Sequence, residues 1–531
     1  MGLLVLALFP IAAWILPGYW LTRWRLPNAS PLMVAAASLS FGLVTVVPLG
    51  YTVSYAFRTP LTPLIVLAAA GVVSAFAVWG RRRFPVVESS GPPSSPSQSL
   101  ATVVGVLFLV LLAVLCTRLQ ATDASALFSP CLHESGLVLS EDGTGGGLET
   151  YDHRLGGMVT HLTARPSEQG YGLEHILGHQ RPGSMATFAQ GLVFHGSGTL
   201  VVLLFMYDLL VALMAALMFS HWVRSRMGVL LFTGAFLMGC HTVSGYMLNE
   251  NMLALGLALS IWWLAPRVQR WGDALLLGAM VVLCVALRPV ALCVLPAVLL
   301  LMPRVHAGWA GFLLGLIVFA LPWWITNAQS FGSMWAHPPL GLGQYEQSFL
   351  GFNFTFHPLN WPVADGLLRG VDSPFPNWFR VPLEHLAAFG AVFWTLVALG
   401  IVTVGRRRVL AAVLFSSPVL LLLGLIVSLD HEKLSYALMA FAPLPMLVGA
   451  GTAAWIGTRA VSVVRKSIAA GLALGFVVGV PVWAQNASVS VDTRDQYHTT
   501  NAPSGVTVEG DRARLLSVHW LPNVRPHLWD V

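Results

Sequence analysis

The sequence predicts an all-α polytopic membrane protein, a bundle of transmembrane helices whose external loops carry interfacial helices. Composition indicates this class. Of 531 residues, 56% are hydrophobic and only 10% are charged, against about 25% charged in an ordinary soluble domain. Because so few charges cannot cover a soluble protein of this length, the apolar surface is expected to face lipid. The formal net charge of +6 therefore requires no nucleic-acid partner.

Apolar runs define the expected spans. They fall at residues 3–22, 32–55, 62–80, 101–118, 198–220, 228–245, 250–265, 273–287, 289–303, 309–326, 385–404, 409–428, 434–456 and 467–484. This gives about 14 spans, although the short pair around Arg288 could also form one long kinked helix. The first run lacks a basic leading segment and a small-residue cleavage site, so it is expected to be a retained helix.

Basic residues fall on alternate loops between these spans. The clusters are Arg23 and Arg25, Arg81 to Arg83, Arg224 and Arg226, Arg267 and Arg270, Arg304, Arg406 to Arg408, and Arg459 with Arg465 and Lys466. Loops rich in Lys and Arg face the cytoplasm. This alternation predicts that the intervening loops are external, which suits the cytoplasmic (inner) membrane of a bacterium.

The chain divides into segments of different composition. Three helices (1–83) precede a cytoplasmic Pro/Ser linker (84–100), a helical core follows (101–484), and an external tail ends the sequence (485–531). The core contains external loops at 119–197 and 327–384. Loops of this length between spans are usually functional.

The first external loop holds many acids and histidines. Its acids are Asp123, Glu134, Glu141, Asp142, Glu149, Asp152, Glu168 and Glu174. Residues 154–164 and 172–179 could lie on the membrane surface as amphipathic helices. The alternative for any single acid here is an ordinary solvated loop position.

Several short segments resemble the GT-C superfamily of membrane glycosyltransferases. QRPGS at 180–184, before a helix ending FHGSG at 194–198, resembles the exit of that family's first loop, and Asn249-Glu250-Asn251 resembles its polar pair at the start of a span. GAMVVLCVALRP at 278–289 is similar to the family's glycine-containing helix ending in Arg-Pro. LPWWITNAQSFG at 321–332 is the most specific match, and His431-Glu432-Lys433 resembles a late basic-aromatic hairpin.

The resemblance covers residues 100–460 in order and is nearest to the protein mannosyltransferase and aminoarabinose transferase branch (family 39-type). It implies a GT-C-type fold and a glycosyltransferase that takes a polyprenyl-phosphate-linked sugar as donor. The acceptor is a lipid, glycan or protein at the external face, and the partners are membrane lipid and the donor. A divalent metal is compatible with this chemistry, and no other cofactor is implied.

Family members carry acidic residues early in the first external loop. A carboxylate there accepts the acceptor's proton. Here Asp152 is the closest match for that base and Glu149 the second choice, since they directly precede an expected interfacial helix. The family's adjacent acidic pair is missing at 149–152. The adjacent acids Glu141 and Asp142 instead lie in a glycine-rich turn.

The expected substrate-binding residues are polar groups on the external side. Arg288 is the first candidate for the leaving phosphate, because a charge between two apolar runs costs about 2.5–3.5 kcal/mol and therefore needs a partner. The alternative is a helix-end arginine that reaches the headgroups. Further candidates are Arg181, Lys433, His431, Glu250 and Asn249, and for Glu250 and Asn249 helix capping is an equal explanation.

Two polar residues inside apolar runs have no role in that resemblance. His241 is predicted to be a hydrogen-bonded histidine between helices rather than a ligand. Asp208 indicates either a buried partner or an error in the span boundary.

Two other functions share many of these features. A transporter or lipid flippase would also have many spans and a charge within the membrane, but it needs access from both faces. An O-antigen ligase or polymerase uses lipid-linked sugars, but its long external loop is expected late in the chain.

Overall fold

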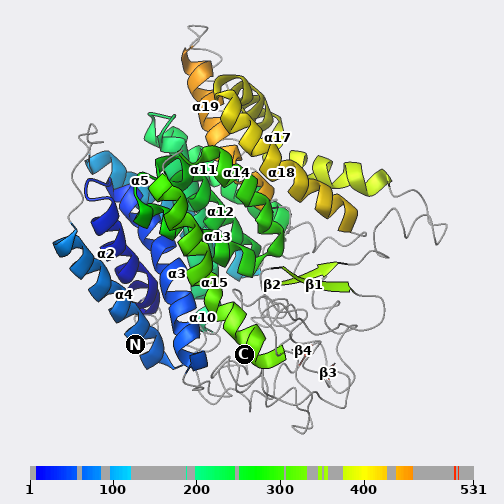
Figure 1. The fold of residues 1–531 in the computed structure, drawn as a ribbon. Coiled ribbons are helices and arrows are strands. Elements are labelled where there is room, and N and C mark those ends of the chain that lie inside the picture. Colours follow the sequence, from blue (N-terminus) through cyan, green and yellow to red (C-terminus); the bar gives the residue numbers. More distant parts are fainter. Residues whose placement is uncertain are drawn as a thin grey trace.

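The computed structural model describes most of the helical core (Figure 1). The described residues are 8–56, 62–84, 96–120, 187, 190, 198–244, 250–303, 306–331, 345–349, 352–356, 375–426, 438–457, 508–509 and 512–513. The fold in these residues is helical, with two short hairpins. The helical elements are η1 (Ile11–Ile15), α2 (Leu16–Arg25), α3 (Pro31–Ala56), α4 (Pro63–Arg83), α5 (Pro96–Gln120), α10 (Gly198–Ser220), α11 (Arg226–Ser244), α12 (Glu250–Leu264), η3 (Ala265–Arg267), α13 (Trp271–Leu287), η4 (Pro289–Cys293), α14 (Val294–Leu301), α15 (His306–Phe331), α17 (Phe375–Thr403), α18 (Arg406–Ile426) and α19 (Leu444–Gly457).

The hairpins are a feature that the sequence analysis did not predict. Strand β1 (Tyr345–Phe349) pairs antiparallel with β2 (Phe352–Phe356) inside the second long loop. Strand β3 (Val508–Glu509) pairs with β4 (Arg512–Ala513) in the tail. The segment FNFTF in β2 alternates aromatic and polar residues, which is the period of a strand with one buried face.

Several helices have the length and composition of membrane spans. In the part of the chain that the structure describes, four helical segments are long and apolar enough to cross a membrane: Pro31–Val53, Pro63–Arg83, Val202–Ser220 and Leu438–Gly457. Large apolar side chains are also exposed on the bundle, such as Leu64 (77%), Phe108 (65%) and Val402 (87%). A soluble monomer rarely exposes extended apolar surface of this kind. The described helices therefore form a bundle with an apolar exterior.

The N-terminal helices pack closely because glycines face their neighbours. A Cβ at Gly18 would lie 1.7 Å from Ser38 O, and one at Gly42 would lie 1.7 Å from Trp14 O. Any side chain at these positions would separate α2 and η1 from α3. Small residues at helix contacts allow this close approach.

Helices α13 and α15 pack side by side and run in the same direction. A Cβ at Gly311 would lie 2.2 Å from Trp271 O, and one at Gly315 would lie 2.4 Å from Leu275 O. Residues that are the same number of positions along the two helices therefore lie opposite each other. The register places Trp271 level with Gly311.

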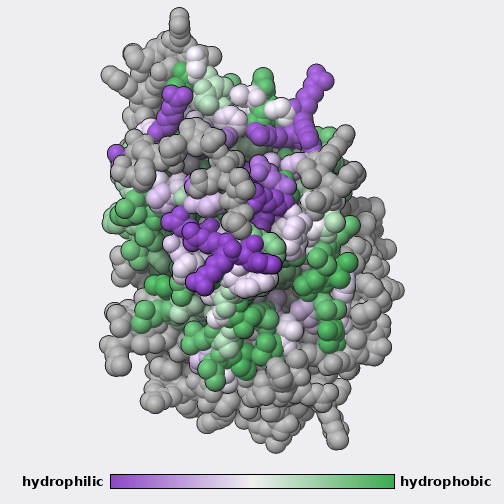
Figure 2. All heavy atoms as spheres, turned by 60° about the vertical axis from the view of Figure 1, so that its left-hand side comes forward, coloured by the Kyte–Doolittle hydropathy of each residue, from purple (hydrophilic) through white to green (hydrophobic). Residues whose placement is uncertain are grey.

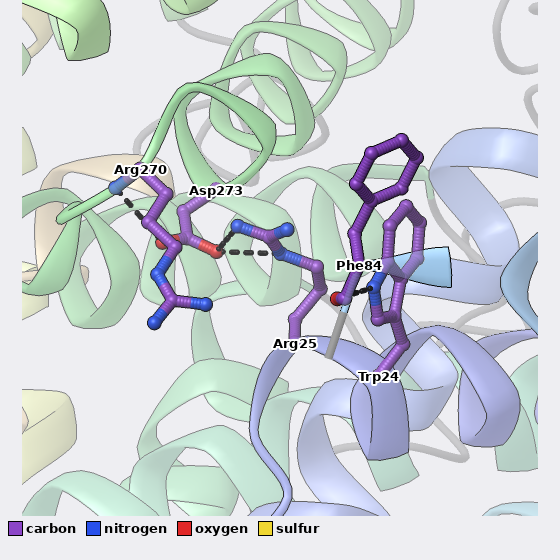
Figure 3. A network of polar contacts seen from close by, with 5 residues as sticks. All are labelled: Trp24, Arg25, Phe84, Arg270 and Asp273. Atoms are coloured by element: carbon purple, nitrogen blue, oxygen red, sulfur yellow. Dashed lines mark hydrogen bonds and ion pairs between the residues drawn. The ribbon is translucent and has the colours of Figure 1, made fainter. Parts of the chain in front are cut away.

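The basic loops meet at one end of the bundle. Arg25, at the end of α2, donates from Nε and Nη2 to Asp273 Oδ1 at 2.8 and 2.7 Å. Its neighbour Trp24 donates from Nε1 to the carbonyl oxygen of Phe84, directly after α4, at 3.2 Å. Figure 3 shows these contacts linking three loops that lie far apart in the sequence.

Further contacts lie at the same basic end of the bundle. Arg407, at the start of α18, donates to Met302 O after α14 at 2.9 Å. Partial burial and the nearby guanidinium groups of Arg267 and Arg408 lower the pKa of His221, which follows α10. The basic clusters that the sequence assigned to one side of the membrane therefore lie together in space, as far as the structure describes them.

Candidate functional site

Arg288 lies in a break between two helices. Helix α13 ends at Leu287, and the short helix η4 begins at Pro289. Arg288 has extended backbone (φ −146°, ψ 108°) and donates its N–H to Cys284 O. The ring of a proline disfavours helical backbone in the residue before it. The stretch around Arg288 is therefore divided into α13, η4 and α14, and the alternative of one long kinked helix is wrong.

The side chain of Arg288 is buried. Only 2% of the residue is exposed. An arginine that reaches out to lipid headgroups would keep its guanidinium accessible, so this burial does not fit the headgroup alternative, and phosphate binding stays a prediction. A buried guanidinium needs polar or anionic neighbours, because leaving water costs it several kcal/mol.

The start of α12 reaches the same level as Arg288. Helices α12 and α13 pack antiparallel, and Cys284 Sγ donates to Ala254 O at 3.4 Å. Arg288 lies four residues beyond Cys284, and Glu250 lies four residues before Ala254. Both are thus about 6 Å, or one helical turn, beyond that contact. The fold brings the backbones of these two predicted site residues to one level on adjacent helices.

Next to Glu250, Asn251 is fully buried, although Asn249 was the predicted residue. Glu250 is the first residue of α12, where an acid is favourably placed against the helix dipole. Capping and substrate binding by Glu250 both stay predictions. Asn249 itself lies outside the described residues.

A buried hydrogen-bonded pair lies one turn deeper. His241 Nε2 and Asp208 Oδ2 are 2.9 Å apart, and both side chains are 0% exposed. They join the middle of α10 to the last turn of α11. The prediction that His241 is hydrogen-bonded between helices is confirmed. For Asp208, the buried partner is the correct alternative and a span-boundary error is excluded.

Helix register places this pair relative to Arg288. A Cβ at Gly256 would lie 2.8 Å from Leu210 Cδ2, so α10 and α12 are level there, and Asp208 is level with Ala254. Glu250 and Arg288 lie one turn further toward the end. Asp208 Oδ1 makes no hydrogen bond to any residue the structure describes. Asp208, Glu250 and Arg288 therefore lie between the interior of the bundle and the end opposite the basic loops.

Gln190 is a buried polar residue that the sequence analysis missed. It accepts from Trp14 Nε1 at 3.1 Å and donates to Val46 O and Val47 O at 3.2 and 3.1 Å. A Cβ at Gly50 would lie 2.7 Å from its Nε2, so that glycine leaves room for the amide. Gln190 therefore links η1 to α3. No sequence pattern distinguishes this glutamine from a surface residue.

The other predicted site residues lie outside the part that the structure describes. They are the candidate bases Asp152 and Glu149 and the candidate binding residues Arg181, His431 and Lys433. The described residues contain no group of three or more His, Cys, Asp or Glu side chains that could hold a metal ion. Of the predicted set, the structure therefore positions Arg288 and the first residue of α12.

No protein-family model, curated protein or solved structure matches this chain.

The Asp208–His241 pair is expected to stabilise the fold modestly. Hydrogen bonds between helices in membrane bundles contribute about 0.6 kcal/mol on average and about 1.7 kcal/mol at most. Asp208→Asn keeps the shape and removes the charge, so it should lower the free energy of unfolding by an amount in that range. Denaturant titration of the purified protein in detergent measures this.

A matched control for that variant is Ser260→Ala. Ser260 is also buried, but its hydroxyl donates to Gly256 O of its own helix. Its loss removes no contact between helices, so the change should be smaller. Equal losses from the two variants would contradict a stabilising role for the Asp208–His241 contact.

Proposed function

We propose that this chain is a GT-C-type membrane glycosyltransferase. It moves a sugar from a polyprenyl-phosphate donor to a lipid, glycan or protein acceptor at the external face of a bacterial cytoplasmic membrane. The observation that carries the proposal is the buried Arg288, level with the start of α12, at the end of the bundle opposite the basic loops. The order of the GT-C-like segments along the chain supports it.

The proposed topology has the helices crossing the membrane many times. The grouping of the basic loops at one end supports this, because positive charge is retained on the cytoplasmic side. In that orientation Arg288, Glu250 and the two long loops face outward. A lipid-linked sugar presented at the external surface would then meet a buried cation.

The chemistry assigns a task to each group. The acceptor oxygen attacks the anomeric carbon, and the bond from that carbon to the phosphate oxygen breaks through an oxocarbenium-like state. Asp152, or Glu149 as second choice, takes the acceptor's proton. The electron pair leaves on the phosphate, whose charge Arg288 stabilises through charge-assisted hydrogen bonds.

The test is turnover of defined donors by the purified protein. Vesicles containing the protein and a polyprenyl-phosphate sugar should release polyprenyl phosphate only when an acceptor is present. Comparing donors that differ in the sugar alone identifies the substrate. Absence of release with every sugar, in protein that retains its fold, would contradict the proposed reaction.

A transporter is the second candidate, and one observation favours it. The buried Asp208–His241 pair resembles the ionisable groups that carry protons in transporters. The same vesicles separate the two functions. Accumulation of a solute or flipping of the lipid-linked sugar without sugar transfer would favour transport.

The topology gives a further expected result. A cysteine introduced at Ser135, in the first long loop, should react with an impermeant thiol reagent in intact cells, whereas one at Ser94, in the Pro/Ser linker, should not. Both positions lie outside the described residues, so labelling is an independent measurement. Reaction at position 94 and not at position 135 would show that the protein has the opposite orientation in the membrane.

A further inference from the structure

An apolar groove lies between the N-terminal helices and the core. Its volume is about 460 Å³, and α2, α3, α4, α13 and α15 line it. Nearly all of its lining is apolar, including Leu49 on α3, Val73 on α4 and Leu275 on α13. This groove lies where the three N-terminal helices meet the helical core.

The groove opens sideways onto the apolar exterior. Val72 and Phe76 on α4 are 60% and 53% exposed, and Leu321 and Ile325 on α15 are 45% and 37% exposed. These side chains form the two edges of its opening. In a membrane this opening would face the lipid chains.

The groove is long and narrow. One end is at Trp271, which is level with Gly311, and the other reaches Ile325, fourteen residues further along α15. At 1.5 Å per residue the groove is about 21 Å long. A helix about 10–12 Å wide with its side chains would fill at least about 1,600 Å³ over that length, more than three times the groove volume of about 460 Å³. The groove therefore fits a single hydrocarbon chain and excludes a partner helix.

Basic residues surround one end of the groove. Arg25 and Trp271 line that end, and Arg25 is held by Asp273 (Figure 3). Arg81, Arg82 and Arg83 at the end of α4 are exposed, and the Trp24–Phe84 hydrogen bond holds that end of α4 against α2. Figure 2 shows hydrophilic side chains gathered beside apolar surface on this face of the molecule.

The charge at this end is strongly positive. Among the described residues of the loops 23–27, 81–84 and 267–273, Asp273 is the only acid, and Arg25 neutralises it. The remaining arginines favour a phosphate group. Basic pockets between membrane helices on the cytoplasmic side bind anionic headgroups.

We propose that this groove binds an anionic phospholipid of the cytoplasmic leaflet, with one acyl chain between α4 and α15 and its phosphate against the arginines. The inference rests on the membrane orientation given under the proposed function. One leaflet of the hydrocarbon core is about 15 Å deep, which the groove length of about 21 Å accommodates. The groove is separate from the proposed donor site, because Arg288 lies at the opposite end of the bundle.

The experiment measures lipid binding to the purified full-length chain in detergent. The probes are two phospholipids with identical acyl chains, one with a phosphoglycerol headgroup and one with a phosphocholine headgroup. Native mass spectrometry gives the affinity of each. The phosphoglycerol lipid should bind at least several times more tightly, and added salt should reduce this difference.

Two variants of α15 test the place of binding. Leu321→Trp puts a large ring at the edge of the groove and should lower the affinity for the phosphoglycerol lipid about tenfold. Leu313→Trp is the control, because Leu313 is similarly exposed (56%) and does not line the groove. Equal binding by both variants, or equal binding of both headgroups by the unaltered protein, would overturn the proposal.

A variant of the basic end and a third lipid complete the design. Arg270→Gln should weaken phosphoglycerol binding severalfold and leave phosphocholine binding unchanged. If the variant still prefers the phosphoglycerol lipid as strongly as the unaltered protein does, the basic end does not bind the headgroup. Polyprenyl phosphate, added as competitor, should not displace the phospholipid, and displacement would assign the groove to the lipid carrier. No sugar transfer is measured, so failure here is distinguishable from failure of the proposed enzyme.

Discussion

Asp152→Asn is expected to reduce sugar transfer by about 10²- to 10⁴-fold, the contribution typical of a general base. The amide keeps the shape of the carboxylate and cannot accept the acceptor's proton. Donor binding should survive, because the phosphate contact is proposed at Arg288. Single-turnover measurements with saturating donor separate the chemical step from binding.

Two neighbouring acids are the controls for Asp152. Glu149→Gln should cost less activity, and Asp142→Asn should cost almost none if the glycine-rich turn is a solvated loop. The outcome that contradicts the assignment is full turnover by Asp152→Asn together with loss of turnover by Asp142→Asn. The base would then lie at 141–142.

The helices of this fold follow closely from apolar runs. The run at 62–80 becomes α4 (Pro63–Arg83), and the run at 198–220 becomes α10 (Gly198–Ser220). Length and continuity of apolar residues are enough for such segments, since each satisfies its own backbone hydrogen bonds. The Arg-Pro step at 288–289 also marks a helix end correctly, because the proline restricts the residue before it.

Contacts between helices were not predictable in the same way. A sequence shows that Asp208 needs a partner, but the choice of His241 depends on how α10 and α11 are rotated against each other. The buried amide of Gln190 depends on the space left by Gly50, 140 positions away. Such pairings depend on how the helices pack, which hydrophobic periodicity in the sequence does not predict.

The two ends of the bundle differ in a way that composition alone does not show. Basic side chains meet at one end and hold the loops together through Arg25–Asp273 and Arg407–Met302. Near the other end, the described buried polar groups include Arg288, Asn251, and the Asp208–His241 pair one turn deeper. A buried charge is costly and a surface charge is not. A buried charge therefore needs a reason to be retained, and we expect the function at the end that holds Arg288.

Arg288→Ala is expected to weaken use of the lipid-phosphate donor by about one to two orders of magnitude. A hydrogen bond to a charged group contributes about 1.5–3 kcal/mol, and its loss falls on the step in which the phosphate gains charge. Arg288→Lys should recover part of the activity only, because an ammonium cannot reproduce the paired donors of a guanidinium. The dependence of the rate on donor concentration measures both variants.

The control for Arg288 is Arg224→Ala, an exposed arginine at the basic end of the bundle. It removes the same charge from the chain without touching the proposed site, so donor kinetics should stay at the level of the unaltered protein. A helical circular dichroism spectrum identical to that of the unaltered protein establishes that Arg288→Ala is folded. If that folded protein uses the donor as well as Arg224→Ala does, Arg288 does not bind the phosphate, and its burial serves the packing of α13 against its neighbours.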